Sequence, residues 1–340
     1  MSAAGGVLVT HADSSLGSAV ARALLAAPEE RPLVLLASGP RPRRLTQAIA
    51  QAPGRRVTWL QARLDRHRSA GDAFRCAAAR EAAPEAVVYV PMHGSEGARR
   101  TGPARVPSRT AEARVVTALC RETPSVRRLV AIGSAFVYRL EPGNANRLHE
   151  RQALDFEGNV PTELRSWIDC DVLLRQEAEE TGLALTLLRV PAVLAADGRV
   201  HGHPALETGR ARPLGFDPLC AVVTEEDVAR AVLAALRAEA SGIFNVAGPD
   251  CVPLSVLRRW TGCSAAPLPG ALLRAAGATL RRVGAREVAA SLDPAYQRFG
   301  FTLDTRRAEH ELGFRARSRV ALGRAGEGVL RIEHGASTPG

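Results

Sequence analysis

The sequence contains no lysine, and all 45 of its basic residues are arginine. This absence excludes any mechanism that depends on a lysine side chain. Alanine and arginine are both abundant, so a genome rich in G and C could have removed lysine without selection. The missing lysine is therefore strong evidence about mechanism and weak evidence about selection.

Aromatic residues make up 4% of the chain, and the six cysteines are far apart with no C-x-x-C pair. This spacing excludes a disulfide framework and a cysteine zinc site. No charged-then-apolar leader follows Met1, and no run of about 18 apolar residues occurs. We therefore expect a cytoplasmic protein.

The net charge of +10 would suit a nucleic acid or an anionic membrane surface as partner. However, the arginines are spread along the chain in pairs, with no run of five and few aromatic residues between them. The alternative is arginine used for solubility. No segment stands out as a dedicated membrane-surface helix.

Short apolar segments alternate with amphipathic helical segments of about 12 residues through the first half of the chain. This alternation predicts an α/β fold, a Rossmann-type doubly wound parallel sheet with a smaller C-terminal α/β lobe. We expect a nucleotide-binding core over 1–165. Residues 166–330 should hold the rest of the sheet interleaved with the lobe, and 331–340 a flexible tail.

The first strand, turn and helix lie where a Rossmann fold places its phosphate loop: residues 7–10 (VLVT) precede 11–17 (HADSSLG). Further segments then follow in the order and spacing of one family. They are 129–138 (LVAIGSAFVY), 187–193 (LLRVPAV), 222–231 (VVTEEDVARA), 242–248 (GIFNVAG) and 303–314 (LDTRRAEHELGF).

Over about residues 5–320 the chain resembles the extended short-chain dehydrogenase/reductases, in their NAD-dependent epimerase/dehydratase group (UDP-glucose 4-epimerase-like). The resemblance implies a Rossmann fold, an NAD or NADP cofactor and a nucleotide or nucleotide-sugar ligand. It also implies a homodimer through the helices expected at 110–121 and 166–180, with Val172, Leu173 and Leu174 as candidate contacts.

The phosphate loop departs from the family's T-G-x-x-G-x-x-G pattern. His11 and Ser14 replace the first two glycines, which serve the tight turn and the approach to pyrophosphate, and Gly17 keeps the third, which serves helix packing. A dinucleotide in the standard pose is therefore disfavoured, while the helix N-terminus can still attract an anion. The predicted cofactor contacts of this loop are Thr10, Ser14, Ser15, Leu16 and Gly17.

The segment after the second strand, 37–41 (ASGPR), lacks the acidic residue that NAD users of the family place there. If a dinucleotide binds, Arg41, Arg43 and Arg44 favour a 2′-phosphate, hence NADP over NAD; the alternative is a solvated arginine turn. Arg63 replaces a carboxylate after the third strand. Bulky residues at 89–93 (YVPMH) replace small ones after the fourth.

The resemblance implies a catalytic serine and a Y-x-x-x-K pair, in which tyrosine is the acid/base and lysine lowers its pKa and holds the nicotinamide ribose. Ser134 keeps the serine, but Trp167 and Asp171 occupy the tyrosine and lysine positions. Tryptophan has no titratable hydroxyl, and aspartate would raise a neighbouring phenol's pKa. Ser134 is therefore predicted to be vestigial.

A substitute acid/base would have to come from nearby side chains. Asp169 and Cys170 adjoin Asp171, and His11 and His93 follow strand ends, so a His–Asp pair is chemically capable of proton transfer. The His201-Gly-His203 pair has weak metal-site spacing without a nearby carboxylate or cysteine, so no metal site is predicted.

Three functions remain open. The first is a catalytically impaired member of the family that acts as a ligand-sensing or scaffold module. The second is an NAD(P)-dependent nucleotide-sugar epimerase, dehydratase or reductase with a non-standard acid/base. The third is a basic protein that binds RNA or anionic lipid.

Overall fold

The computed structural model describes residues 5–91, 109–156, 160–207, 211–238, 240–292, 294–322 and 330–333. At its centre lies a seven-stranded parallel sheet with the strand order β12-β7-β5-β4-β1-β2-β3, which confirms the predicted Rossmann-type α/β class. The strands are β1 (Gly6–Val9), β2 (Leu33–Ala37), β3 (Val57–Gln61), β4 (Pro84–Tyr89), β5 (Arg128–Ser134), β7 (Ala184–Val190) and β12 (Gly242–Asn245).

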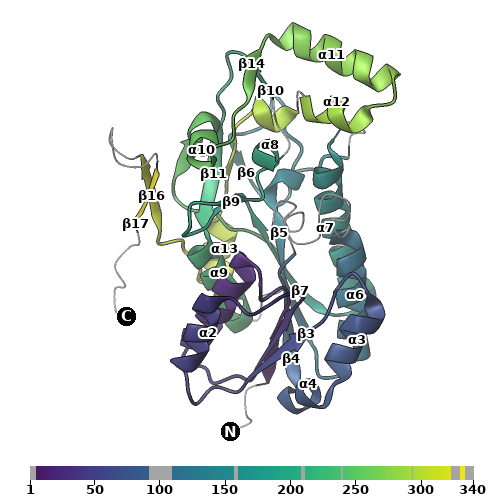
Figure 1. Cartoon of the computed structure of the whole chain (residues 1–340), viewed down its shortest axis with the longest axis vertical. Coiled ribbons are helices and arrows are strands. Elements are labelled where there is room, and N and C mark those ends of the chain that lie inside the picture. Colours follow the sequence, from purple (N-terminus) through teal and green to yellow (C-terminus); the bar gives the residue numbers. More distant parts are fainter. Residues whose placement is uncertain are drawn as a thin grey trace.

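Helices cover both faces of this sheet (Figure 1). Because successive side chains of a strand point to opposite faces, Val7 and Val9 join one core cluster and Leu8 joins the other. One face carries α1 (Ser15–Ala26), α2 (Arg43–Ala50) and α9 (Glu225–Ala238). The other carries α3 (His67–Arg75), α4 (Ala77–Ala82), α6 (Arg109–Glu122) and α7 (Thr162–Thr181).

A smaller lobe grows from the carboxyl side of the sheet, because the chain leaves the core after β7, returns for α9 and β12, and leaves again. The lobe's main sheet has the order β13-β11-β8-β9, and β10 pairs with β14. Its strands are β8 (Ala192–Leu194), β9 (Val200–His201), β10 (Ala211–Pro213), β11 (Leu219–Thr224), β13 (Cys251–Pro253) and β14 (Ala266–Leu268). Its helices are α8 (Pro204–Glu207), α10 (Leu254–Thr261), α11 (Gly270–Arg282) and α12 (Arg286–Leu292).

Short elements complete the chain around these two parts. A 3-10 turn, η1 (Ala135–Val137), follows β5, and a second, η2 (Ala295–Gln297), follows α12. The remaining elements are β6 (Arg147–Leu148), β15 (Thr302–Leu303), α13 (Arg306–Glu311), β16 (Arg319–Leu322) and β17 (Leu330–Glu333). The tail expected from residue 331 therefore begins with strand residues, and 334–340 lie outside the described residues.

Several boundaries differ from the sequence-based expectation. The helix α7 begins at Thr162, directly after Pro161, so the expected boundary between residues 165 and 166 falls inside a helix. The arginines at 43 and 44 open the helix α2 instead of a turn. Leu45 is buried, and Ala48 and Ile49 pack against the same core, so this short helix carries the i, i+3, i+4 apolar spacing of a helix over only eight residues.

Asp227, from the motif at 222–231, fastens the C-terminal segment to the core. It lies in the first turn of α9 and is buried, and its carboxylate accepts hydrogen bonds from the backbone N–H groups of Arg317 (3.0 Å) and Ser318 (2.9 Å). Thr224 Oγ1 and Arg230 contact the same carboxylate. One side chain thus supplies the acceptors for two otherwise unpaired backbone donors.

We predict that Asp227→Ala destabilises the fold by about 3 kcal/mol, because buried N–H donors lose their acceptors. Glu226→Ala, on the half-exposed neighbour in the same helical turn, is the matched control and should change stability by less than about 0.5 kcal/mol. Urea denaturation of both variants measures the difference. Equal effects of the two substitutions would contradict the role given to Asp227.

Candidate functional site

The turn after β1 has a left-handed residue where the resemblance implies the first glycine of the phosphate loop. His11 occupies that position with φ +46°, in the left-handed region that glycine adopts without cost. A residue with a Cβ there costs about 1 kcal/mol or more. His11 therefore adds a side chain to a left-handed turn that favours glycine.

The added imidazole is buried and points into the protein. His11 Nε2 lies 3.3 Å from Glu112 Oε2 of α6, and the Tyr89 hydroxyl at the end of β4 lies 3.5 Å from the same oxygen. All three side chains are buried. Burial raises the pKa of Tyr89 well above its usual value. This polar cluster fills space between the phosphate loop and α6 at the carboxyl edge of the sheet.

Gly17, at the third glycine position of the loop, is tightly packed, as its predicted role in helix packing requires. A Cβ on Gly17 would lie 2.1 Å from the His11 carbonyl oxygen, so the first turn of α1 packs directly on the loop. Ser14 caps this helix by accepting a hydrogen bond from Gly17 N–H at 2.9 Å. Thr10 Oγ1 accepts from Val90 N–H, and Leu16 is buried in the core.

The side chain of Asp13, from the loop between β1 and α1, lies at the end of β2. Asp13 Oδ2 accepts hydrogen bonds from the backbone N–H groups of Ser38 (3.1 Å) and Gly39 (2.6 Å). The acid that the family places at the end of β2 is thus replaced, at the same strand end, by one from the preceding loop. Arg41, predicted to contact a cofactor, instead stacks over Trp59 at 5.1 Å from the ring centroid.

A cleft of about 520 Å³ runs along the N-terminal half of α1. Arginines from three elements line it, and Ser14 and Ser15 lie at its helix-terminal end. The sequence predicted Ser15, Arg43 and Arg44 here, but not Arg22, although Ser15, Ser18 and Arg22 follow the i, i+3, i+7 spacing of one helix face. The lining residues are Asp13, Ser14, Ser15, Ser18, Arg22, Pro42, Arg43, Arg44, Asp197, Arg199 and Glu225.

The cleft combines several positive charges with the N-terminal end of α1, a combination that attracts phosphate groups. Two of its acidic residues already have partners. Asp197 Oδ2 lies 2.7 Å from Arg199 Nη2, and Asp13 accepts hydrogen bonds from the backbone at the end of β2. Arg63, which replaces the family's carboxylate after β3, pairs with Asp65 and does not line the cleft.

An arginine side chain covers Trp167, the residue at the position that the resemblance assigns to the tyrosine. Trp167 is buried, and the guanidinium of Arg109, from the start of α6, lies 4.1 Å from its ring centroid. Arg109 Nη1 donates to Ser166 Oγ at 2.8 Å, and Nη2 contacts the Glu163 carboxylate. An immobile, non-titratable ring therefore stands where the resemblance implies a proton donor.

The lysine position is occupied by one half of a buried ion pair. Asp171 accepts two hydrogen bonds from Arg189 of β7, at 2.8 Å from Nε and 2.8 Å from Nη2, and both residues are at most 3% exposed. Arg175 Nε lies 3.1 Å away on the exposed side. Burial disfavours the charge on Arg189, but the hydrogen bonds from Asp171 more than offset this and raise the pKa of Arg189.

The remaining groups near this pair have structural partners. Ser134 Oγ accepts from Phe136 N–H at 3.1 Å and caps the 3-10 turn η1. Arg189 stacks over Tyr138, whose hydroxyl donates to Asn245 Oδ1 at 2.6 Å. Burial raises the pKa of Tyr138, so this phenol stays protonated at neutral pH. Ser134 at the end of β5 pairs in register with Val190 of β7, next to Arg189, so Ser134 and the pair of Asp171 and Arg189 lie on neighbouring elements.

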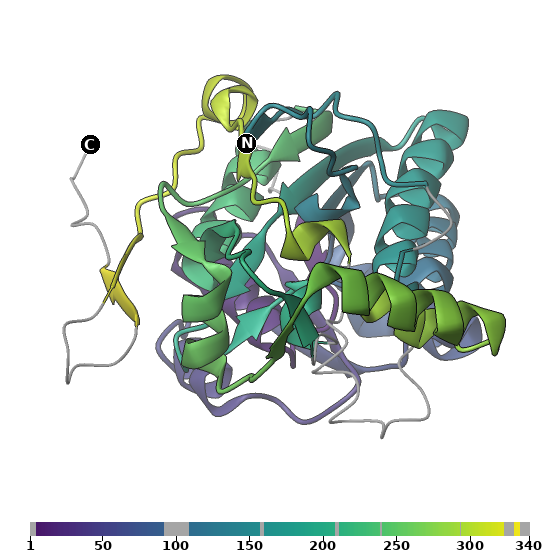
Figure 2. The ribbon, with the colours of Figure 1, turned by 90° about the horizontal axis from the view of Figure 1, so that it is seen from above.

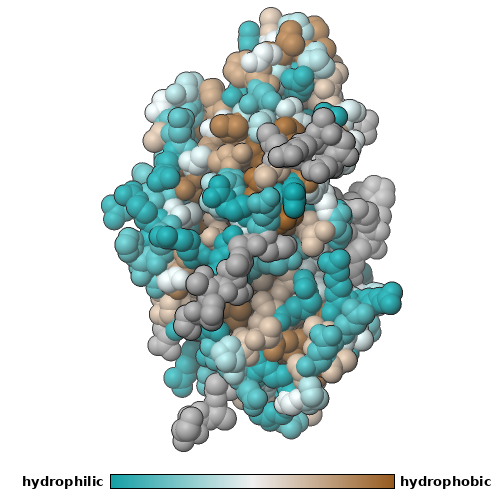
Figure 3. Space-filling model, turned by 90° about the vertical axis from the view of Figure 1, so that its left-hand side faces the viewer, coloured by the Kyte–Doolittle hydropathy of each residue, from teal (hydrophilic) through white to brown (hydrophobic). Residues whose placement is uncertain are grey.

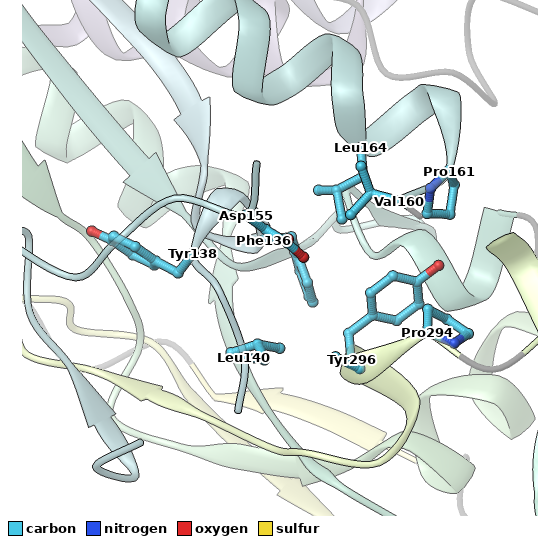
Figure 4. Close-up of a pocket in the computed structure, with 10 residues that line it drawn as sticks. Phe136, Tyr138, Leu140, Asp155, Val160, Pro161, Leu164, Pro294 and Tyr296 are labelled. Carbon is cyan, nitrogen blue, oxygen red and sulfur yellow. The ribbon is translucent and has the colours of Figure 1, made fainter. Parts of the chain in front are cut away.

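A pocket of about 160 Å³ opens between the core and the lobe (Figure 4). Its walls come from η1, the start of α7 and the segment after α12, and they are mostly apolar around Asp155 and Tyr296. The Tyr138 hydroxyl points away from the other labelled side chains in Figure 4, toward its Asn245 partner.

The candidate substitutes for the missing acid/base are placed unfavourably. Asp169 is exposed on the outer side of α7. Cys170 is buried, and burial raises the pKa of its thiol to about 12, so no thiolate forms at neutral pH. His93 lies outside the described residues. His11, paired with Glu112, is the one candidate among the described residues that has a carboxylate partner within 4 Å.

His201 and His203 contact different partners. His201 Nε2 lies 3.7 Å from Glu225, while His203 Nε2 lies 3.2 Å from Cys220 Sγ and its Nδ1 accepts from Ala205 N–H. Burial lowers the pKa of His203 to about 3, so this ring is neutral. Within the described residues, no group of three potential metal ligands is found.

The helices expected to form a dimer, α6 and α7, pack on each other. Leu173 and Leu174 are buried in the core of their own chain, so the expectation that they form an intermolecular face is wrong. The exposed residues of these two helices include Ala111, Arg114, Asp169 and Gln176. A dimer through these helices stays a prediction, and its surface would be polar.

Comparison with known proteins gives the fold. Neither protein-family models nor curated proteins match the chain. Among solved structures, a nucleoside-diphosphate-sugar epimerase from Pseudomonas aeruginosa is similar, with 22% identity, a TM-score of 0.62 and coverage of 92% of this chain and 93% of that one. A UDP-glucose 4-epimerase from Bifidobacterium longum in complex with NAD+ and UDP matches at 14% identity and TM-score 0.62, covering 92% and 93%.

A third similar structure is a dTDP-glucose 4,6-dehydratase from Bacillus anthracis in complex with NAD, at 12% identity and TM-score 0.61, with 92% of each chain covered. Identities this low establish a shared fold. The likeness spans the core and the lobe together, in agreement with the range over which the sequence motifs occur.

We predict that Asp171→Asn destabilises the protein by about 3–5 kcal/mol, because Arg189 is left as an uncompensated buried charge. Asp169→Asn, two residues away on the exposed side of α7, is the matched control and should be nearly neutral. The double variant Asp171→Leu with Arg189→Met should be less destabilised than Asp171→Asn alone. Chemical denaturation tests this order, and a stable Asp171→Asn would contradict it.

Protonation of His203 gives a second prediction. In the unfolded chain histidine titrates near its usual pKa of 6.5, while in the folded protein the value is about 3, so the folded state loses stability as the pH falls between these values. His203→Phe should make the slope shallower by up to about 1.4 kcal/mol per pH unit. The exposed His310→Phe is the control; an unchanged slope for His203→Phe would refute the assignment.

Proposed function

We propose that this protein, which has the fold of nucleotide-sugar epimerases and dehydratases, binds a phosphate-bearing nucleotide ligand as a sensing or scaffold module. It does not catalyse the tyrosine-dependent hydride transfer that the family resemblance implies. The observation that carries the proposal is the buried pair of Asp171 and Arg189 at the lysine position.

This pair reverses the electrostatics that the reaction needs. A lysine beside the active tyrosine stabilises the phenolate, whereas the Asp171 carboxylate is committed to Arg189 and its charge would oppose a phenolate. Trp167 offers no proton and is held under Arg109. Restoring activity would require replacing the tryptophan, the aspartate and the arginine that pairs with it.

The nicotinamide end of a dinucleotide does not fit the residues present. The positions that would hold its ribose are Trp167 and Asp171, and Ser14 stands where the resemblance implies a glycine that lets the backbone approach the pyrophosphate. We therefore derive no chemical step through NAD or NADP.

The phosphate-bearing part of a nucleotide does fit. The cleft beside α1 supplies Arg22, Arg43 and Arg44 together with the first turn of the helix, while its fourth arginine, Arg199, pairs with Asp197. These groups suit a diphosphate or a ribose phosphate by charge and by bidentate hydrogen bonding. Since Arg43 and Arg44 open α2 beside the end of β2, NADP is preferred over NAD if either binds.

Ligand binding can be measured by thermal shift with NAD, NADP, UDP and UDP-glucose. At a concentration about 100-fold above Kd, a true ligand should stabilise the protein by about 2.7 kcal/mol, or roughly 5 °C. The double variant Arg43→Gln with Arg44→Gln should lose most of this shift. The control Arg68→Gln with Arg80→Gln, on exposed arginines away from the cleft, should keep it.

Turnover is the second arm of the same experiment. No epimer, dehydration product or NADH should form from UDP-glucose and NAD at high protein concentration. Product formation would overturn the non-catalytic part of the proposal, and its loss in His11→Gln would identify the His11–Glu112 pair as the substitute acid/base. Absence of a shift with every nucleotide would overturn the ligand-binding part.

A further inference from the structure

The cleft beside α1 is bounded by two helix N-termini. Ser14 caps α1, which begins at Ser15. Pro42 stands at the N-cap of α2, which begins at Arg43, and all four residues line the cleft. Viewed from above, the lobe (green) lies in front of the purple N-terminal segments of the chain (Figure 2), and its turn between β8 and β9 lines the cleft as well. Two helix N-termini on one cleft favour an anionic ligand, because each carries a partial positive charge.

Three arginines of the cleft have no partner within the described chain. Arg22, Arg43 and Arg44 make no ion pair, side-chain hydrogen bond or ring contact with any residue that the structure describes. The Nε atom of Arg22 is also shielded from solvent and has no hydrogen-bond acceptor there. Because buried N–H donors in folded proteins nearly always have an acceptor, this atom indicates an acceptor that comes from outside the chain.

The acidic residues that line the cleft do have partners. Asp197 pairs with Arg199. Asp13 accepts hydrogen bonds from the backbone at the end of β2, and the carboxylate of Glu225 lies 3.7 Å from an imidazole nitrogen of His201. The three arginines without partners are therefore the charges that remain available to a ligand.

Arg43 and Arg44 stand where a positive charge does not stabilise the fold. The first turn of α2 contains no acidic residue, and its N-cap has no side-chain hydrogen bond. A helix N-terminus favours negative side chains, so two arginines there lower the stability of α2. Departures of this kind from the local rules of stability are expected at functional sites.

The face of the molecule that carries α2 is largely hydrophilic. It faces the viewer in Figure 3, where teal side chains cover much of the surface. The exposed residues of α2 include Arg43, Arg44, Thr46 and Gln47. Among the helices of the described residues, none is long and apolar enough to span a membrane. The polar surface of α2 suits a charged ligand.

The donors of α1 form a row along the cleft. Ser15, Ser18 and Arg22 lie on one face of the helix and span seven residues, which is about 10 Å along its axis. The row begins at the free N–H groups of the first turn and ends at a guanidinium group. Donors arranged in a row suit a chain of phosphates better than a single phosphate.

The cleft offers no aromatic ring on which a base could stack. None of the described residues that line it is aromatic, asparagine or glutamine, and its one apolar residue is Pro42. Trp59 is covered by Arg41, and neither residue lines the cleft. Stacking on an aromatic side chain strengthens binding by roughly 5- to 150-fold for each base. A ligand of this cleft does not gain that contribution.

We propose, building on the proposed function, that the cleft recognises the phosphates of its ligand and not the base. Its ligands are compounds with a chain of two or more phosphates that ends in a free phosphate, whether nucleoside diphosphates and triphosphates or inorganic polyphosphate. A free terminal phosphate carries a charge of about −1.5 to −2 at neutral pH, so a chain with one further phosphate matches the three guanidinium groups in charge. Each guanidinium can also donate two hydrogen bonds to one phosphate.

The test is isothermal titration calorimetry of the full chain at low salt with pyrophosphate, UDP, ADP, UDP-glucose and uridine. UDP and ADP should bind with dissociation constants within about threefold of each other, and pyrophosphate should bind within about tenfold of UDP. Uridine should not bind. UDP-glucose, whose terminal phosphate is esterified, should bind at least about tenfold more weakly than UDP.

A charge reversal separates recognition of phosphate from a structural role. Arg43→Glu/Arg44→Glu should weaken pyrophosphate binding at least about tenfold, while its thermal midpoint should not fall, because carboxylates are favourable at the N-terminus of α2. The control Arg66→Glu/Arg68→Glu makes the same change in charge at the N-terminus of α3, outside the cleft, and should bind as the unmodified chain does.

The outcomes distinguish this proposal from the proposed function. Binding of UDP without pyrophosphate, or a difference of more than about tenfold between UDP and ADP, would overturn recognition through phosphate and leave the proposed function intact. Binding of pyrophosphate without any nucleotide would overturn the proposed function and leave the phosphate site in place. No binding of any compound, or equal loss in the α3 control, would overturn both.

Discussion

The pair of Asp171 and Arg189 is the constraint around which this site is built. Two charges removed from water are tolerated when their geometry is good and their hydrogen bonds are complete, and here both carboxylate oxygens meet the guanidinium at 2.8 Å. Neither residue can change alone without leaving a buried charge. The position that the resemblance assigns to a catalytic lysine has therefore become part of the interior that holds α7 against β7.

The same change of role extends along the carboxyl edge of the sheet. Trp167 packs under the Arg109 guanidinium, Ser134 caps a turn, and the Tyr138 hydroxyl donates a hydrogen bond to Asn245. On the other side of this edge, His11 stands where the resemblance implies a glycine, and its ring contacts the Glu112 carboxylate. Each of these side chains has a local partner, whereas the arginines beside α1 line an open cleft.

The sequence was sufficient for the fold because the fold depends on repeated signals. Continuous apolar strands, alternating helices and widely separated motifs all favour one doubly wound sheet. Gly17 shows why single positions can also be predicted: a backbone carbonyl 2.1 Å from any added Cβ leaves glycine as the only residue that fits. The assignment of Trp167 and Asp171 to the tyrosine and lysine positions rests on their spacing to later motifs and stays a prediction.

The partners of those residues could not be predicted in the same way. The ion pair of Asp171 joins residues 18 apart, His11 meets Glu112 across 101 residues, and Asp13 reaches the end of β2 from the preceding loop. Such contacts depend on side-chain direction, which spacing does not encode. The helix α2 was missed because only eight residues carry its signal, although Leu45, Ala48 and Ile49 follow helical spacing.

A chain without lysine must use arginine for every positive charge, and the structure shows how different those uses are. Arg189 and Arg109 are buried, where a planar guanidinium can satisfy a carboxylate or cover an aromatic ring. Arg55 donates to the carbonyls of Leu24 and Ala27 and so terminates α1, a task that needs several donors in one plane. Exposed arginines use directed hydrogen bonds as well: Arg237 meets the Glu29 carboxylate with Nε at 2.6 Å and Nη2 at 2.9 Å, and Arg319 meets Asp250 with the same two atoms. A lysine ammonium cannot reproduce such paired contacts, so this protein uses the geometry of guanidinium both in its core and on its surface.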